Sequence, residues 1–176
     1  MPDTAILDHP AITLQTVWPD RIEPETWQRW APESEDQFPP ETGNWLVPMG
    51  FWLQHADALR GRSSAVGLLI EPQDGVERLR GQLHGLALIA VDFPSFKQGQ
   101  GFSHGRLLRT RLGWQGEMRA VGNVLIDIVH YLARCGFDSF TITPDHDPAV
   151  AQQQFQAFSL HYQKHYRNPN TDMAPA

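Results

Sequence analysis

The chain has 176 residues, of which 41% are hydrophobic and 19% charged, as in a soluble globular protein with room for one core. No apolar run approaches the roughly 18 residues of a membrane-spanning helix, and the N-terminus lacks the features of a secretory signal, so a cytoplasmic location is expected. The single Cys135 excludes an intrachain disulfide framework and a cysteine-based metal cluster.

Charge is distributed unevenly along the chain. The formal net charge is −6, and residues 1–45 hold nine acidic side chains against Arg21 and Arg29. Residues 97–134 reverse this balance, with six basic side chains against Glu117 and Asp127. General nucleic-acid binding is not expected at this net charge, whereas a local basic site for a small anion or an acidic partner is compatible with it.

The beginning of the chain differs in composition from the rest. Residues 1–44 are rich in proline, acidic residues and tryptophan, and we expect an irregular N-terminal extension there. One short helix is expected between Val17 and Trp30. Residues 45–166 are expected to form a single α/β domain, and residues 167–176 a flexible tail.

Within the domain, four apolar runs each lead into a helical pattern. After an extended piece and a first helix at residues 45–59, the runs cover residues 65–70, 86–93, 116–122 and 138–143. Asp74 and Glu77 have the spacing of a capping box for the helix after the first run. Asn123 is expected to cap the third helix, and Asp147 followed by proline to start the fourth, which continues to about Tyr162.

Four consecutive strand–helix units predict an α/β fold with a mainly parallel sheet. Such units form either an open three-layer sheet or a half-barrel that a second copy completes, and the open sheet is the favoured prediction. In both arrangements ligands bind outside the carboxyl ends of the strands. The connections that follow the strands therefore hold the candidate functional residues.

The longest connection enters the second helix of the four units and is rich in glycine. Gly99 and Gly101 permit backbone conformations and close approaches that other residues do not, and Ser103 is placed to cap the helix or to help its free amides hold an anion. Arg106 projects from the first turn, where the helix dipole favours the same negative group. The pattern predicts an anion site; the alternative is an ordinary capped loop with solvated arginines. The glycine spacing matches neither a dinucleotide fingerprint nor a P-loop.

Other candidates are polar residues on the predicted strands and helices. Arg119 interrupts a strand and needs a partner there, either a bound anion or an acid such as Glu117, Asp127 or Asp138. A helical wheel places Arg109 opposite the leucine face of its helix. Asn123 directly follows a predicted strand, so it is expected at the same edge of the sheet as the glycine-rich connection. His104 is the candidate general acid or base, or else an exposed loop residue.

No metal site and no particular cofactor is predicted. Asp145, His146 and Asp147 form a potential ligand cluster, but Asp147 already serves as a helix cap. His161 and His165 have a chelating spacing without an accompanying carboxylate. Neither group is expected to hold a metal ion.

Residues 93–140 read FPSFKQGQGFSHGRLLRTRLGWQGEMRAVGNVLIDIVHYLARCGFDSF. This stretch resembles the bacterial domain-of-unknown-function family numbered 934, with its recurring FPxFxDGRG, ARLLR, RAxG and RCGFD elements. The matching positions are Phe93, Pro94, Phe96, Gly99, Gly101, Ser103, Arg106, Leu107, Leu108, Arg109, Gly116, Arg119, Gly122, Cys135, Gly136, Phe137 and Asp138.

The resemblance implies a link to sulfur metabolism. Members of this family often occur beside assimilatory sulfite-reductase genes and are described as oxidoreductases or accessory proteins of sulfite reduction. This sequence departs from the family pattern at Gln98 and Gln100, where an acid and a base are usual. Because an acid and a base are lost together, two explanations are open. Either the two charges form an ion pair with each other in other members, or the site has altered chemistry in this protein.

Three functions are compatible with these observations. The first is an accessory or oxidoreductase-type protein of sulfite assimilation that binds a small oxyanion or phosphate-bearing ligand through Gly99, Gly101, Ser103, Arg106, Arg119 and Asn123. The second is a non-enzymatic interaction module that docks on a sulfite-reductase component or forms a homodimer. The third, a hydrolase or lyase using His104 or the 145–147 cluster, has the least support.

Overall fold

A computed structural model describes residues 14–34, 37–95 and 99–156. One eight-stranded sheet, with the strand order β2-β1-β8-β7-β6-β5-β4-β3, forms its centre. The strands are β1 (Gln15–Val17), β2 (Ile22–Pro24), β3 (Trp27–Arg29), β4 (Asn44–Pro48), β5 (Val66–Ile70), β6 (Leu88–Phe93), β7 (Glu117–Gly122) and β8 (Ser139–Ile142). The helices are α1 (Met49–Arg60), α2 (Gln100–Thr110), α3 (Val129–Arg134) and α4 (Pro148–Gln153), with short 3-10 turns η1 (Val76–Leu79), η2 (Ile126–Ile128) and η3 (Gln154–Gln156).

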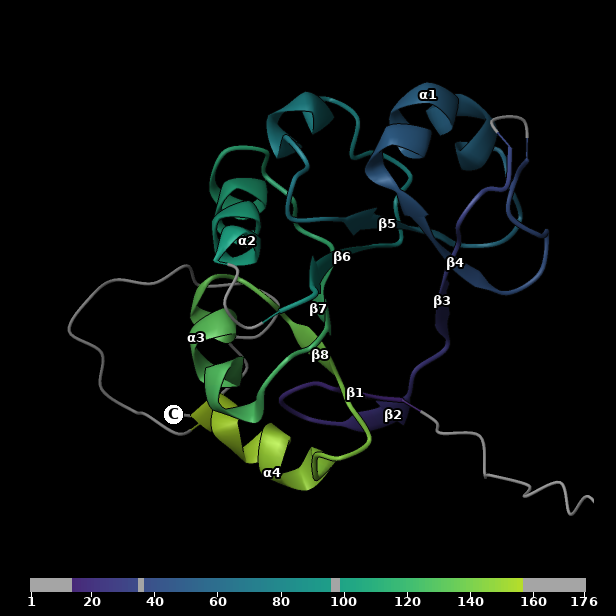
Figure 1. Cartoon of the computed structure of the whole chain (residues 1–176). Helices are drawn as coiled ribbons and strands as arrows, with labels where there is room; N and C mark the ends of the chain where they lie inside the picture. The colour runs from purple at the N-terminus through teal and green to yellow at the C-terminus, as the bar shows by residue number, and fades with distance from the viewer. Residues whose placement is uncertain (1–13, 35–36, 96–98, 157–176) are drawn as a thin grey trace, which may run out of the picture.

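The α/β prediction with consecutive strand–helix units is confirmed. Strands β3 to β8 all pair in parallel, whereas β1 runs antiparallel to β8 and β2 antiparallel to β1. The sheet is curled as a half-barrel, with the helices around its outside (Figure 1). The curled form therefore replaces the open sheet that the sequence favoured.

A single stretch of chain explains why the sheet curls. Strands β2 and β3 are separated only by Glu25 and Thr26, yet β2 pairs with β1 at one edge of the sheet and β3 with β4 at the other. The three peptide units between Pro24 and Trp27 span at most about 11 Å. The two edges must therefore come close together, which a flat eight-stranded sheet does not allow.

The two faces of the sheet are both largely buried, and they differ in chemistry. The outer face contributes aliphatic side chains to one core shared with the helices, including Leu68, Ile70, Ile89, Val91 and Met118. The inner face carries a small apolar cluster of Leu46, Leu69, Leu88, Ala90, Val121 and Trp27. Buried polar residues from the same alternating positions, such as Arg119 and Thr141, lie beside it. Burial on both faces accounts for the near-continuous apolar runs.

The N-terminal part of the chain differs from its prediction. The expected short helix between Val17 and Trp30 is wrong, because this region forms β1, β2 and β3. Pro19 and Pro24 lack the backbone N–H that a helix needs, and residues such as Val17 and Ile22 suit strands. The supposed irregular extension thus supplies both edges of the sheet.

Two predicted helix starts are also corrected. Instead of capping a helix, the Asp74 carboxylate accepts a hydrogen bond from the Glu71 N–H at 2.8 Å, and only the short η1 follows. Asn123 does not cap the third helix, since α3 begins at Val129 after the 3-10 turn η2. The Asp147 cap is confirmed, because its Oδ1 accepts from the Ala149 N–H at 2.8 Å. The predicted extension of this helix to Tyr162, and the 167–176 tail, lie outside the described residues.

Two glycines of α2 allow this helix to lie directly on aromatic rings. A Cβ added to Gly101 would overlap the ring of Phe93, and one added to Gly105 would lie 2.5 Å from Phe137 Cε2. Neither glycine has a positive φ, so their role is close packing. Gly99 also has a negative φ, of −82°, and open space where its Cβ would be.

We predict that Gly101→Ala destabilises the protein and that Gly99→Ala does not. Overpacking a core costs about 1–3 kcal/mol, which exceeds the roughly 1 kcal/mol that alanine gains over glycine within a helix. Substitution at Gly99 should change the free energy of unfolding by less than about 0.5 kcal/mol. Urea denaturation of both variants measures the difference. Equal stability of the two would contradict this account of α2.

Candidate functional site

The start of α2 lies at the carboxyl edge of the sheet, directly after β6. Gly99 is the N-cap residue, no side chain among the described residues caps the helix, and its first turn contains no acidic residue. Free backbone N–H groups and the positive end of the helix dipole therefore face outward here. Such an end of an eleven-residue helix favours a negatively charged group.

Ser103 does not cap this helix as predicted. It is the fourth residue of α2, one turn beyond Gly99, and its side chain is exposed. A cap must precede the first turn, and the helix begins earlier than the sequence indicated, at Gln100. Ser103 and Gly99 remain exposed near the helix start, whereas Gly101 is buried against Phe93.

Asn123 lies at the same edge of the sheet. Its backbone N–H donates to the Phe93 carbonyl oxygen at 2.7 Å, which joins the ends of the neighbouring strands β6 and β7. The residue is exposed. The structure therefore brings Asn123 to the end of the strand from which the chain continues toward α2.

The arginines of α2 have different surroundings. Arg106 and Arg111 are exposed, and no hydrogen bond or ion pair of either guanidinium is found within the described residues. Arg109 is buried, contrary to its predicted place opposite the core. The helical wheel gave the wrong side for Arg109 because it counts only hydrophobic side chains. Gly101 and Gly105 allow the side of α2 that they share to lie against the sheet.

Arg109 fastens several loops together. Its guanidinium donates to the backbone oxygens of Trp114, Gly116 and Gly136 at 2.7–2.9 Å and to Asp138 Oδ2 at 2.5 Å. The same carboxylate oxygen accepts from the Met118 N–H at 2.8 Å. Loss of one member of such a buried pair typically costs about 3–5 kcal/mol. Arg109 is thus explained by the fold.

His104 is buried between α2 and the rest of the protein. Its side chain is 8% exposed, and its Nδ1 has no hydrogen-bond partner among the described residues. Burial lowers the pKa of His104, although the carboxylates of Asp74 and Glu77 act in the opposite direction. A neutral, enclosed imidazole has little access to a ligand at the exposed helix start, so its expected role as a general acid or base gains no support.

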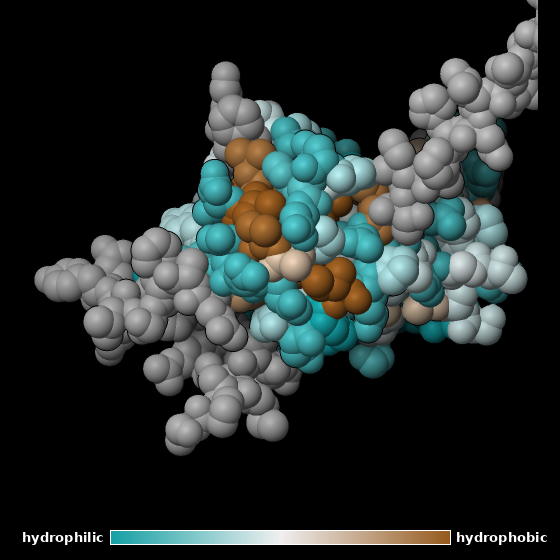
Figure 2. Space-filling model, turned by 90° about the horizontal axis from the view of Figure 1, so that it is seen from below, coloured by the Kyte–Doolittle hydropathy of each residue, from teal (hydrophilic) through white to brown (hydrophobic). Residues whose placement is uncertain are grey.

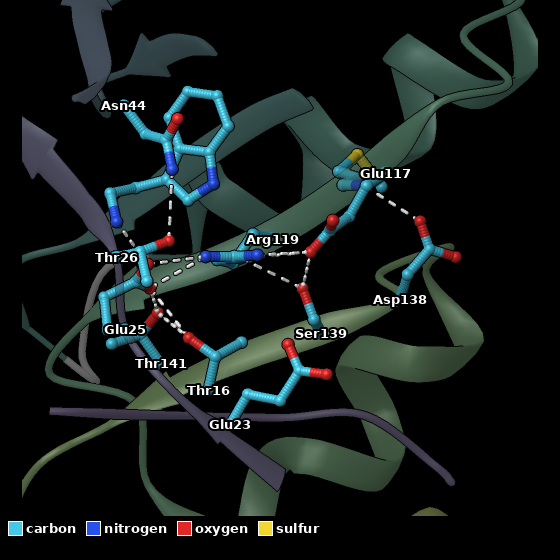
Figure 3. Close-up of polar contacts among 12 residues, drawn as sticks. Thr16, Glu23, Glu25, Thr26, Asn44, Glu117, Arg119, Asp138, Ser139 and Thr141 are labelled. Carbon is cyan, nitrogen blue, oxygen red and sulfur yellow. Dashed lines mark hydrogen bonds and ion pairs between the residues drawn. The ribbon is translucent and has the colours of Figure 1, made fainter. Parts of the chain in front are cut away.

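Arg119, in β7, lies on the inner face of the sheet between Glu25 and Glu117 (Figure 3). Its Nη1 donates to both carboxylate oxygens of Glu25 at 2.7 and 2.9 Å, and its Nη2 to Glu117 Oε1 at 2.7 Å. Its Nε contacts Glu117 Oε1 and Ser139 Oγ. Of the three acids considered as partners from the sequence, Glu117 pairs with Arg119, and Glu25 is a second anion that the sequence analysis did not consider.

Glu25 is held as a carboxylate by this cluster. Burial by itself would raise the pKa of Glu25, but the Arg119 charge and hydrogen bonds from Thr141, Trp27 and Thr16 outweigh it. The pKa therefore lies below its ordinary value of 4.5. The side chains of Glu25 and Arg119 are 8% and 4% exposed, so solvent screens their interaction little.

A second pair connects opposite parts of the inner face. The half-exposed Arg29 of β3 forms an ion pair with the buried Asp92 at the carboxyl end of β6. A Cβ at Gly122, whose φ is +94°, would clash with this carboxylate. The sequence analysis did not identify Arg29 or Glu25 as members of these ion pairs. The excess of acids in residues 1–45 was the available signal for Glu25.

No metal or membrane feature is found within the described ranges. They contain no group of three or more His, Cys, Asp or Glu side chains placed to hold a metal ion. In the same residues, every helix is too short or too polar to cross a bilayer. His161 and His165 lie outside these ranges. Cys135 is half-buried, and burial raises the pKa of its thiol against the opposing charges of Arg106 and Arg134.

Comparison with known proteins identifies the family. Residues 67–172 match the model of a family described as bacterial proteins of unknown function, DUF934. The match covers more than half of the chain, from β5 through α4, and includes the start of α2 and the partners Arg109 and Asp138. Strands β1 to β4, with Glu25, lie before it. No curated protein matches the chain.

We predict that His104 makes the protein less stable in mildly acidic solution. The folded pKa lies below the ordinary value of 6.5, so the unfolded chain binds a proton first as the pH falls. Stability is then lost below about pH 6.5, with a slope of at most about 1.4 kcal/mol per pH unit. His104→Leu should flatten the curve of unfolding free energy between pH 7 and 5, as measured by urea denaturation. Exposed His84→Gln is the control, and the same curve for both variants would contradict the prediction.

Proposed function

The chain belongs to the DUF934 family of bacterial proteins of unknown function, and we propose that it is an accessory or oxidoreductase-type protein of assimilatory sulfite reduction that binds a small oxyanion or phosphate-bearing ligand at the start of α2. The observation that carries the ligand proposal is the first turn of α2, which no side chain of the described residues caps, followed on the exposed side of the helix by Ser103 and Arg106. Arg106 was expected in the first turn, but it is the seventh residue of α2, because the helix begins earlier, at Gln100. Its guanidinium has no hydrogen bond or ion pair within the described residues. The sulfite assignment is supported by the resemblance of residues 93–140.

The proposed site combines three kinds of donor. The amide groups that follow Gly99 lack side-chain acceptors, the Ser103 hydroxyl is exposed one turn later, and Arg106 supplies a full positive charge. Gln100, which stands where the family has a base, leaves Arg106 as the one arginine or lysine between residues 99 and 106. Asn123 lies at the same edge. Arg119 does not belong to this site, because Glu25 and Glu117 occupy its guanidinium.

An oxidoreductase role requires electrons from outside the described residues. The raised thiol pKa of Cys135 argues against a reactive thiolate in this chain. A component of sulfite reductase, carrying its own cofactor, is therefore the partner that we propose for the redox step. The chain would hold the oxyanion and the partner would supply the electrons.

We predict that sulfite, sulfate or phosphate binds to the wild type and that Arg106→Ala weakens binding about tenfold or more. A hydrogen bond to a charged group contributes about 1.5–3 kcal/mol, and 1.4 kcal/mol corresponds to a factor of ten. Isothermal titration calorimetry at low salt measures the affinities. Arg111→Ala, which removes an equal charge from the other end of α2, is the matched control. Absence of wild-type binding, or equal losses in both variants, would reject the site.

The alternative function is protein–protein docking as a homodimer. The observation that favours it is an apolar area surrounded by hydrophilic residues on the face seen from below in Figure 2. Tyr131 and Val150 are among the large hydrophobic side chains that the described residues leave exposed, at 53% and 41%. Light scattering during size-exclusion chromatography should then give twice the 19.9 kDa chain mass. A monomer at all concentrations would exclude this alternative.

A further inference from the structure

The carboxylate of Glu25 lies in an unusually complete set of donors. Oε2 accepts hydrogen bonds from the hydroxyls of Thr16 at 2.7 Å and Thr141 at 2.6 Å. Oε1 accepts from the Trp27 N–H at 2.8 Å. Arg119 Nη1 lies within 2.9 Å of both oxygens (Figure 3). Each oxygen thus has at least two donors, as a bound carboxylate ligand would.

These donors form a receptor for an ionised carboxylate. Glu117 already balances the charge of Arg119, and burial opposes any further anion. The pKa of Glu25 nevertheless lies below its ordinary value, so the hydrogen bonds and the guanidinium stabilise a second carboxylate in this position. The donors around Glu25 therefore stabilise a carboxylate in this position even though Glu117 already neutralises the charge of Arg119.

The receptor and its occupant come from different parts of the chain. Arg119 and Thr141 lie on β7 and β8, within the residues that match the family. Glu25 lies outside the match, in the two-residue connection between β2 and β3. Thr16 lies beside Thr141 because β1 pairs with β8 in this register. This pairing does not involve the segment that carries Glu25. Most of the receptor is therefore built independently of Glu25.

We propose that Arg119, Thr16 and Thr141 form a carboxylate-binding site on the inner face, occupied by Glu25 of the same chain, and that a small organic carboxylate fills it when the Glu25 carboxylate is absent. The site is separate from the one at the start of α2. Because ligand and Glu25 exclude each other, binding of a free carboxylate in the native chain is coupled to release of the segment Ile22–Arg29 from the sheet edges.

The donor arrangement also sets a ligand preference. All the donors address two oxygens, and none is left for the additional oxygens of a tetrahedral anion. A planar carboxylate such as acetate or formate reproduces the head group of Glu25. Sulfate would bring unpaired oxygens into a buried position, which is costly. Acetate and formate should therefore bind in preference to sulfate.

Removal of the Glu25 side chain followed by addition of acetate tests the site. Glu25→Ala should be less stable than the wild type, because a buried cluster loses its anion. Acetate at ten times its dissociation constant should raise the folding equilibrium constant of this variant about tenfold. Chloride and sulfate at the same ionic strength should have little effect. Thermal unfolding followed by circular dichroism measures the change, and wild-type protein should respond equally to acetate and chloride.

Two further substitutions, each combined with Glu25→Ala, identify the site of action. Thr141→Val removes one donor and should weaken the acetate effect about tenfold or more. Arg106→Ala should leave it unchanged, which separates this site from the one at the start of α2. The proposal is overturned if acetate stabilises Glu25→Ala no more than chloride does. It is likewise overturned if this variant stays unfolded at every acetate concentration, or if Thr141→Val has no effect.

Discussion

The ion pair between Glu25 and Arg119 joins the two constraints on which the fold depends. One is covalent, because only Glu25 and Thr26 separate strands that belong to opposite edges of the sheet. The other is electrostatic, because an arginine within a buried strand requires an anion nearby. Glu25 satisfies both, since the segment that draws the edges together also brings the carboxylate to Arg119. The curl of the sheet and the polarity of its inner face are consequences of this arrangement.

Packing accounts for most of the residues that carry the resemblance of residues 93–140 to the family. Phe93 and Gly101 set the approach of α2, Phe137 fills the space beside Gly105, and Arg109 with Asp138 fastens the loops around β7. Few of the other residues that carry the resemblance lack a structural role. Ser103 and Arg106 are exposed and are not needed for the core. This contrast, rather than the presence of glycines, is the reason for proposing a binding surface at the start of α2.

Local patterns were sufficient to predict the strands β5 to β8, but not every helix that follows them or how the sheet is completed. Apolar runs and the Asp147 cap are short-range signals, and they located β5 to β8 and α4. Strands β1 to β3 have three residues each, too few for a periodic pattern. The pairing of β1 with β8, which attaches this region to the rest of the sheet, joins segments that lie far apart in sequence. Glu25 and Arg119 are 94 residues apart, so charge counting indicated the need for an anion without identifying it. The burial of Arg109 depended on two small residues that a hydrophobicity wheel ignores.

The uneven charge of the chain follows from this self-pairing. The acidic N-terminal region supplies Glu25 to the basic middle region, where Arg119 is consumed in the cluster and Arg109 in its bonds to Asp138 and backbone oxygens. Two of the remaining basic side chains lie on the exposed side of α2 or at its end. These are Arg106 and Arg111; Arg106 is within α2, whereas Arg111 is the C-cap residue at the opposite end from the helix start. The helix dipole favours an anion at the helix start and a cation at the other end, so an anion is attracted to Arg106 by two fields and to Arg111 by one.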